Sequence, residues 1–137
     1  MELAKRFGTS KKLENDGVWH ELGDGAAIKV ARWNNRRFNE LKRQLERKYL
    51  TQQKTGKLPE DIAEKIIIET IAHAVLLDWR GIELNGAPLP AYTPEEGIKV
   101  LTDTAEVNMS EFRDTVAAAS MDMNNFRMER EAEAIKN

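Results

Sequence analysis

The chain has 137 residues, a formal net charge of −2 and no cysteine, with 41% hydrophobic and 32% charged residues. This length corresponds to one domain, and the hydrophobic fraction is enough to build a core without cross-links. The lack of cysteine excludes disulfides, zinc–thiolate sites and thiol nucleophiles. The small net charge gives no general attraction for nucleic acid or for an acidic membrane surface. Because the first residues contain no apolar run and charges interrupt the apolar stretch 62–79, we expect neither a signal peptide nor a membrane span.

The N-terminal part of the sequence predicts an arm followed by a β-hairpin. Residues 1–16 are polar and basic, and we expect them to form an extended or loosely ordered arm. Val18, His20 and Leu22 alternate with Trp19 and Glu21 before Gly23-Asp24-Gly25. After it, Ile28 and Val30 alternate with Lys29 and Ala31. Asp-Gly between alternating segments is a strong hairpin signal. An isolated hairpin is marginally stable, so this one must pack on helices or on a partner.

The rest of the chain shows helical periodicity in four segments. Asn34-Asn35 can cap a helix that ends near Gln53. Pro59 begins a second, very apolar helix, which we expect to run to about Asp78 at the centre of the core. Gly81 stands where a glycine often follows a helix end. The apolar stripe of the first helix consists of Phe38, Leu41, Leu45 and Tyr49.

Prolines and caps delimit the last two helices. Pro88, Pro90 and Pro94 predict an extended connector over residues 82–94. Thr93 can cap a third helix, and Ser110 begins a fourth. The stripe of that fourth helix is Phe112, Val116, Ala119, Met123 and Phe126.

Together these segments predict a mainly α fold: a small helical domain of about four helices with an N-terminal β-hairpin. We expect the arm at 1–16, this single domain at 17–128, and a charged C-terminal tail at 129–137. Because the second helix carries more apolar surface than one protomer is expected to cover, self-association is compatible with the sequence.

No constellation of residues points to catalysis. His20 and His73 each stand alone, without a second ligand at metal-binding spacing. The serines lie outside nucleophile motifs. Gly23-Asp24-Gly25 lacks the lysine and hydroxyl residue of a phosphate loop. We therefore expect no catalytic residues, no cofactor and no metal, and a protein that is not an enzyme.

The strongest charge feature is the segment from Arg32 to Lys48. It holds seven basic and two acidic side chains, a net +5, so with a chain total of −2 the remainder carries −7. The plainest interpretation is the solvated face of a helix. The alternatives are a patch that steers an acidic protein partner, or a nucleic-acid site, and the acidic remainder argues against the latter. The candidate partner-binding residues here are Arg36, Arg43 and Arg47.

A second candidate surface lies near the C-terminus, where methionines and phenylalanines cluster. Methionine is flexible and common on adaptable binding faces, although ordinary core packing is the competing interpretation. We expect the last helix to bind a protein partner, and aspartates at Met123 and Phe126 to abolish that binding without unfolding the chain. The candidate partner-binding residues of this helix are Phe112, Val116, Met123 and Phe126.

Several motifs in order resemble the tail assembly chaperones of long-tailed bacteriophages. They are Lys12-Leu13-Glu14 before Asp16-Gly17-Val18-Trp19, then Leu22-Gly23-Asp24-Gly25-Ala26 and Val30-Ala31-Arg32, then Leu76-Leu77-Asp78-Trp79-Arg80-Gly81, Pro88-Leu89-Pro90, Tyr92-Thr93-Pro94-Glu95 and Asn124-Asn125-Phe126-Arg127. The resemblance covers almost the whole chain.

The resemblance implies a role in the host cytoplasm. Such a chaperone binds the tape measure protein, keeps it soluble, helps to recruit tail tube protein subunits and is absent from the mature virion. Many members occur in two lengths through frameshifting, and this chain would be the short form. The alternative is a small nucleic-acid-binding or structural adaptor protein that uses the basic helix 34–53.

Overall fold

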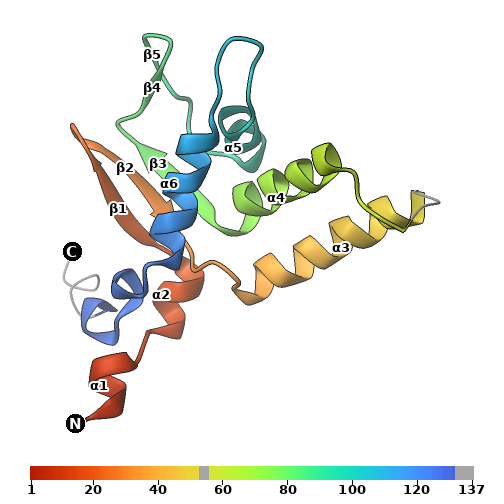
Figure 1. Cartoon of the computed structure of the whole chain (residues 1–137). Coiled ribbons are helices and arrows are strands. Elements are labelled where there is room, and N and C mark those ends of the chain that lie inside the picture. The colour runs from red at the N-terminus through yellow and green to blue at the C-terminus, as the bar shows by residue number, and fades with distance from the viewer. Residues whose placement is uncertain (53–55, 132–137) are drawn as a thin grey trace.

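A three-stranded antiparallel sheet with helices around it forms the body of the molecule (Figure 1). The structure is a computed structural model and describes residues 1–52 and 56–131. Its elements are, in order, α1 (Leu3–Phe7), α2 (Lys11–Asp16), β1 (Val18–Gly23), β2 (Ala26–Val30), α3 (Arg36–Gln52), α4 (Glu60–Ala74), β3 (Leu76–Arg80), β4 (Glu83–Leu84), β5 (Ala87–Pro88), α5 (Pro94–Leu101), α6 (Ser110–Met121) and the 3-10 helix η1 (Met123–Phe126).

The predicted hairpin is confirmed. β1 and β2 pair antiparallel, and Asp24 and Gly25 both have positive φ, at 56° and 78°. Two positive φ angles in succession are what a type I′ turn requires, and asparagine, aspartate and glycine tolerate them best.

The predicted mainly α fold is wrong, because a third strand makes the fold mixed α/β. The second helix was expected to reach Asp78, but α4 ends at Ala74 and β3 pairs with β2 on its free side. A register shift between β2 and β3 leaves Leu77 without an opposite residue. As a result Leu76 and Trp79, three residues apart, are both buried. That spacing imitates the period of a helix, and Gly81 follows a strand instead of a helix.

The N-terminal arm was also predicted wrongly, since residues 3–16 form two short helices. The Glu2 carboxylate accepts hydrogen bonds from the first N–H groups of α1, and the Ser10 hydroxyl accepts one from Leu13 N–H in α2. These side-chain caps satisfy donors that would otherwise lack partners. Leu13 is buried, so α2 is part of the body of the protein.

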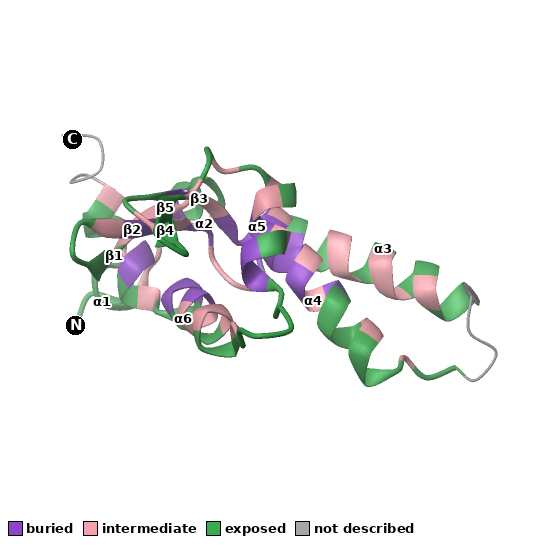
Figure 2. Ribbon diagram, turned by 90° about the horizontal axis from the view of Figure 1, so that it is seen from above, coloured by how far each residue is buried: buried purple, intermediate pink, exposed green. Residues whose placement is uncertain are grey.

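α3 and α4 pack against each other antiparallel, and α3 projects away from the sheet with the N-terminal part of α4 as a helical arm, whereas the C-terminal part of α4 lies in the core (Figures 1 and 2). The predicted cap of α3 is confirmed, since Asn35 Oδ1 accepts the Phe38 N–H at 2.9 Å. Phe38 is buried, while Leu41, Leu45 and Tyr49 are half-buried along the arm. The predicted end of this helix at Gln53 lies outside the described residues.

The extended connector and the third helix are confirmed. β4 and β5 form a small exposed hairpin within residues 82–94, with Asn85 and Gly86 at its turn. Thr93 Oγ1 accepts the Glu96 N–H at 3.1 Å and Pro94 is the first residue of α5.

The fourth predicted helix is broken into two parts. α6 ends at Met121, and the Asp122 carboxylate accepts the Asn124 N–H, which starts η1. Of the predicted charged tail 129–137, residues 132–137 lie outside the described residues.

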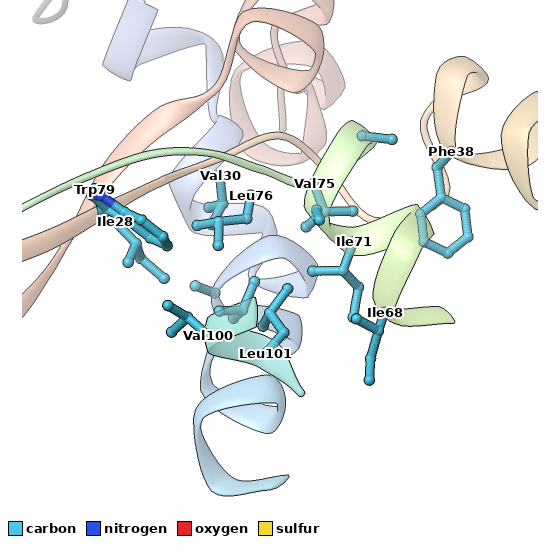
Figure 3. Packing of buried hydrophobic residues seen from close by; sticks show 14 residues of the cluster. Ile28, Val30, Phe38, Ile68, Ile71, Val75, Leu76, Trp79, Val100 and Leu101 are labelled. Carbon is cyan, nitrogen blue, oxygen red and sulfur yellow. The ribbon is translucent and has the colours of Figure 1, made fainter. Parts of the chain in front are cut away.

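The core lies between the sheet, α4, α5 and α6 (Figure 3). Its centre draws side chains from elements far apart in the sequence: Ile28 and Val30 from β2, Ile68 and Ile71 from α4, Leu76 and Trp79 from β3, Val100 and Leu101 from α5, and Val116 from α6. Within the described part of the chain, no helix has the length and apolar character needed to cross a membrane.

Candidate partner-binding surfaces

The four apolar residues predicted to bind a partner do not form one surface. Val116 and Phe126 have no exposed area, because they pack inside the body of the protein. Phe112 is half-buried against the core and Met123 is half-buried in η1. The burial pattern favours the core interpretation of this set, which the sequence analysis left open.

The predicted basic residues, in contrast, are all on the surface of α3. The Arg36 side chain is 90% exposed, and its Nε lies 2.9 Å from Glu40 Oε1 within the same helix. Arg43 and Arg47 are exposed and lie one turn apart. An ion pair that is this exposed adds little stability, so the charges of α3 are available to a partner.

The structure reveals an apolar surface that the sequence analysis missed. α1 contains no buried residue: Leu3 is 66% exposed and Phe7 is 59% exposed. Met1 is also exposed, and Met128 is 52% exposed. We call these four residues the terminal apolar surface.

Backbone pairing joins the segment after α1 to the segment that leads to Met128. Thr9 forms an antiparallel bridge with Arg127, and Ser10 N–H donates to the Phe126 carbonyl at 2.7 Å. The bridge holds the segment that follows α1 against Arg127, the residue before Met128. The sequence signals that could have revealed α1 and α2 are the caps at Glu2 and Ser10.

A cleft of about 380 Å³ lies between α4 and α5. Ile68 and Ile98 line it, and its rim is formed by Asp61, Glu64, Lys65, Glu69 and Asp103. We call it the acid-rimmed cleft. It resembles a helix-binding groove in having apolar walls and charged edges.

Arg113 of α6 forms hydrogen bonds with residues on one side of this cleft. The guanidinium donates to Glu64 Oε1 at 3.0 Å, to Asp103 Oδ1 at 2.9 Å and to the Leu101 carbonyl at 2.7 Å. The Met109 N–H and then Arg113 donate hydrogen bonds to the Asp103 carboxylate and lower its pKa. Hydrogen bonds to the charged form favour ionisation, so this part of the rim stays anionic.

A larger, open cavity of about 1100 Å³ lies between β3 and the connector 82–92. Trp79 Nε1–H donates to the Pro90 carbonyl at 2.8 Å, and the ring of Tyr92 meets that of Trp79 edge-on at 4.7 Å. Burial, helped by Glu95 and Asp78, raises the pKa of the Tyr92 phenol, which therefore stays protonated and donates to the Ala72 carbonyl. These contacts tie the connector to the core.

Among residues 1–52 and 56–131, no three histidine or carboxylate side chains come close enough to hold one metal ion. Three features stand out on the surface of the described residues: the terminal apolar surface, the basic side of α3 and the acid-rimmed cleft.

The comparisons with known proteins give one family. The model of the family described as YdaY prophage protein matches residues 33–137, which include everything from the start of α3 to the end of the chain. No curated protein and no solved structure matches. Because the match covers well over half of the sequence, the chain belongs to the YdaY prophage protein family and is a phage-related protein.

Proposed function

We propose that this protein is a phage tail assembly chaperone, acting in the host cytoplasm, that holds the tape measure protein soluble while tail tube subunits assemble and is left out of the virion. The prophage family supports a phage role. The observation that carries the chaperone role is the terminal apolar surface, where Leu3 and Phe7 of one short helix are 66% and 59% exposed.

The exposure of these two large apolar side chains favours a site that binds another protein. Scattered apolar residues are common on protein surfaces, but neighbouring large ones mark sites of protein interaction. The α1 helix contributes no buried side chain to the core, so truncating Leu3 and Phe7 should cost the fold of the isolated chain little. Their burial against a partner would contribute about 1.5–3 kcal/mol each at most.

This chemistry fits a long, helical client with apolar stripes. One copy covers a short stretch weakly, and many copies along the same client bind strongly through avidity. Flexible methionines such as Met1 and Met128 adapt to stripes of different shape. A weak individual contact also lets tube subunits displace each copy in turn.

The first test removes the two exposed side chains of α1. We expect the Leu3→Ser/Phe7→Ser variant to keep the melting temperature of the wild type, because neither side chain is buried. We expect it to lower the soluble yield of a co-expressed tape measure protein at least about tenfold, since two apolar contacts per copy are lost. The measurement is the soluble fraction of the client at equal chaperone levels.

A matched control changes two other exposed apolar residues in the same way. Leu84 and Val107 are each 40% exposed and lie outside the terminal apolar surface. The Leu84→Ser/Val107→Ser variant should keep the client soluble. If the α1 variant folds and protects the client as well as the wild type does, the assignment of this surface is incorrect.

A further inference from the structure

We propose that the protein associates with a second copy of itself, with the outer side of α3 from one copy docked in the acid-rimmed cleft of the other. By the outer side of α3 we mean Arg43, Arg47 and Leu50. This contact involves neither the tape measure protein nor the terminal apolar surface, so it goes beyond the function proposed above.

The outer side of α3 combines two cations with one apolar side chain. Spacings of four and three residues put Arg43, Arg47 and Leu50 on one side of the helix. Leu50 is 37% exposed, and both arginines are exposed. In the described part of the chain, neither guanidinium forms a salt bridge; Arg43 Nε donates to the Asn39 carbonyl of its own helix at 3.2 Å.

The acid-rimmed cleft offers the complementary groups. Ile68 and Ile98 supply an apolar floor for a leucine. Glu64 and Asp103 are already bonded to Arg113. The carboxylates of Asp61 and Glu69 have no salt bridge among the described residues, so two of the rim's anions are available for two arginines, with Lys65 as the single cation of the rim.

The acidic groups that bind the outer side of α3 must belong to another molecule. The outer side of α3 points away from the stripe Phe38, Leu41, Leu45 and Tyr49, which faces α4 and the core. An arginine on this side cannot turn back across α3 to reach the cleft of its own chain. The charges of the sequence are separated in the same way, with +5 on residues 32–48 and −7 on the remainder, so a second copy brings opposite charges together.

Charge reversal tests this contact on the isolated protein, with no client present. The monomer has a mass of 15.6 kDa. We expect sedimentation equilibrium at low salt to give the wild type a larger mass, which falls toward 15.6 kDa as sodium chloride screens the charges. We expect the Arg43→Glu/Arg47→Glu variant to associate at least about tenfold more weakly, because like charges then face each other.

Two further variants make the test specific. Arg37→Glu/Lys48→Glu makes the same change of charge on a different side of α3, where both residues are exposed, and should associate like the wild type. Asp61→Lys/Glu69→Lys should fail to associate alone but should bind the Arg43→Glu/Arg47→Glu variant in an equimolar mixture. Thermal melts of each variant confirm that it is folded.

Several results would overturn the proposal. They are a wild type that stays at 15.6 kDa at low salt, equal loss of association in the Arg37→Glu/Lys48→Glu control, or a mixture of folded charge-reversed variants that does not associate. A monomeric wild type that binds duplex DNA through Arg43 and Arg47 would assign the outer side of α3 to nucleic acid instead.

Discussion

Replacing Phe126 with alanine should destabilise the protein by about 3–5 kcal/mol, the usual cost of truncating a buried aromatic residue. Phe126 has no exposed area although it lies close to the C-terminal end of the described chain. Its carbonyl also accepts the Ser10 N–H at 2.7 Å, so the residue links η1 to the start of α2. Loss of the ring would loosen both ends of the domain together.

Thermal unfolding followed by circular dichroism measures this effect. For a domain of this size we expect the melting temperature to fall by about 10–20 °C. Met128→Ala is the matched control, because this side chain is 52% exposed and only two residues away; its melting temperature should stay within about 2 °C of the wild type. A Phe126→Ala variant as stable as the wild type would mean that η1 does not pack as described.

This result also changes the meaning of an experiment suggested by the sequence alone. Aspartate at Met123 and Phe126 was expected to remove a binding surface and to spare folding. With Phe126 fully buried, an aspartate there would place a charge in an apolar site, which costs several kcal/mol unless it is paired. Loss of client solubility in that variant would therefore report on folding, and Leu3 and Phe7 are the informative positions for binding.

The sequence predicted the elements whose signals are local. Asp24-Gly25 marks the hairpin turn, and Asn35 and Thr93 cap α3 and α5 as expected. Each of these signals acts within three or four residues and does not depend on the rest of the fold. The exposure of Arg43 and Arg47 is of the same kind, because long charged side chains rarely enter a core.

The third strand could not be predicted because its pattern is ambiguous. Residues 75–79 are apolar at positions that a helix would also bury, and a short apolar run does not distinguish the two structures. The unpaired Leu77 makes Leu76 and Trp79 face the core together, which removes the alternation expected of a strand. Only the pairing with β2, some fifty residues earlier in the chain, decides the outcome.

The terminal apolar surface was missed for a different reason. Leu3 and Phe7 occur in a short, basic segment, and composition favoured an extended arm over a helix. The helices there depend on side-chain caps from Glu2 and Ser10 and on the bridge between Thr9 and Arg127. Pairing between the two ends of the domain is a tertiary contact that no local pattern reveals.

Asn35 is the second position at which a single substitution should have a large effect, because it joins three elements. Its Nδ2 donates to the Arg32 carbonyl at 2.7 Å and to the Ala74 carbonyl at 2.9 Å, while its Oδ1 accepts the Phe38 N–H at 2.9 Å. It thus holds the exit of β2, the start of α3 and the end of α4 at one point, and it is only 8% exposed. The angle of the projecting arm depends on this point.

Asn35→Ala should lower the free energy of unfolding by about 2–4 kcal/mol. Loss of the cap costs about 1 kcal/mol, and the Ala74 carbonyl, left buried without its donor, costs a further 1–3 kcal/mol or so. Urea unfolding measures the change. Asn39→Ala is the control: Asn39 is exposed, and among the described residues its side-chain amide donates only to the Asn34 carbonyl, at 3.0 Å, so its effect should stay within about 0.5 kcal/mol.

Asn35→Asp separates the two roles of this side chain. Aspartate keeps the oxygen that caps α3, but at neutral pH it replaces the donating amide with a carboxylate oxygen that faces the carbonyl oxygens of Arg32 and Ala74. If the donors matter as much as the cap, Asn35→Asp will be no more stable than Asn35→Ala, although aspartate is as good a helix cap as asparagine. Wild-type stability in Asn35→Asp would show instead that the capping oxygen alone anchors the arm, and that the amide bond to the end of α4 contributes nothing.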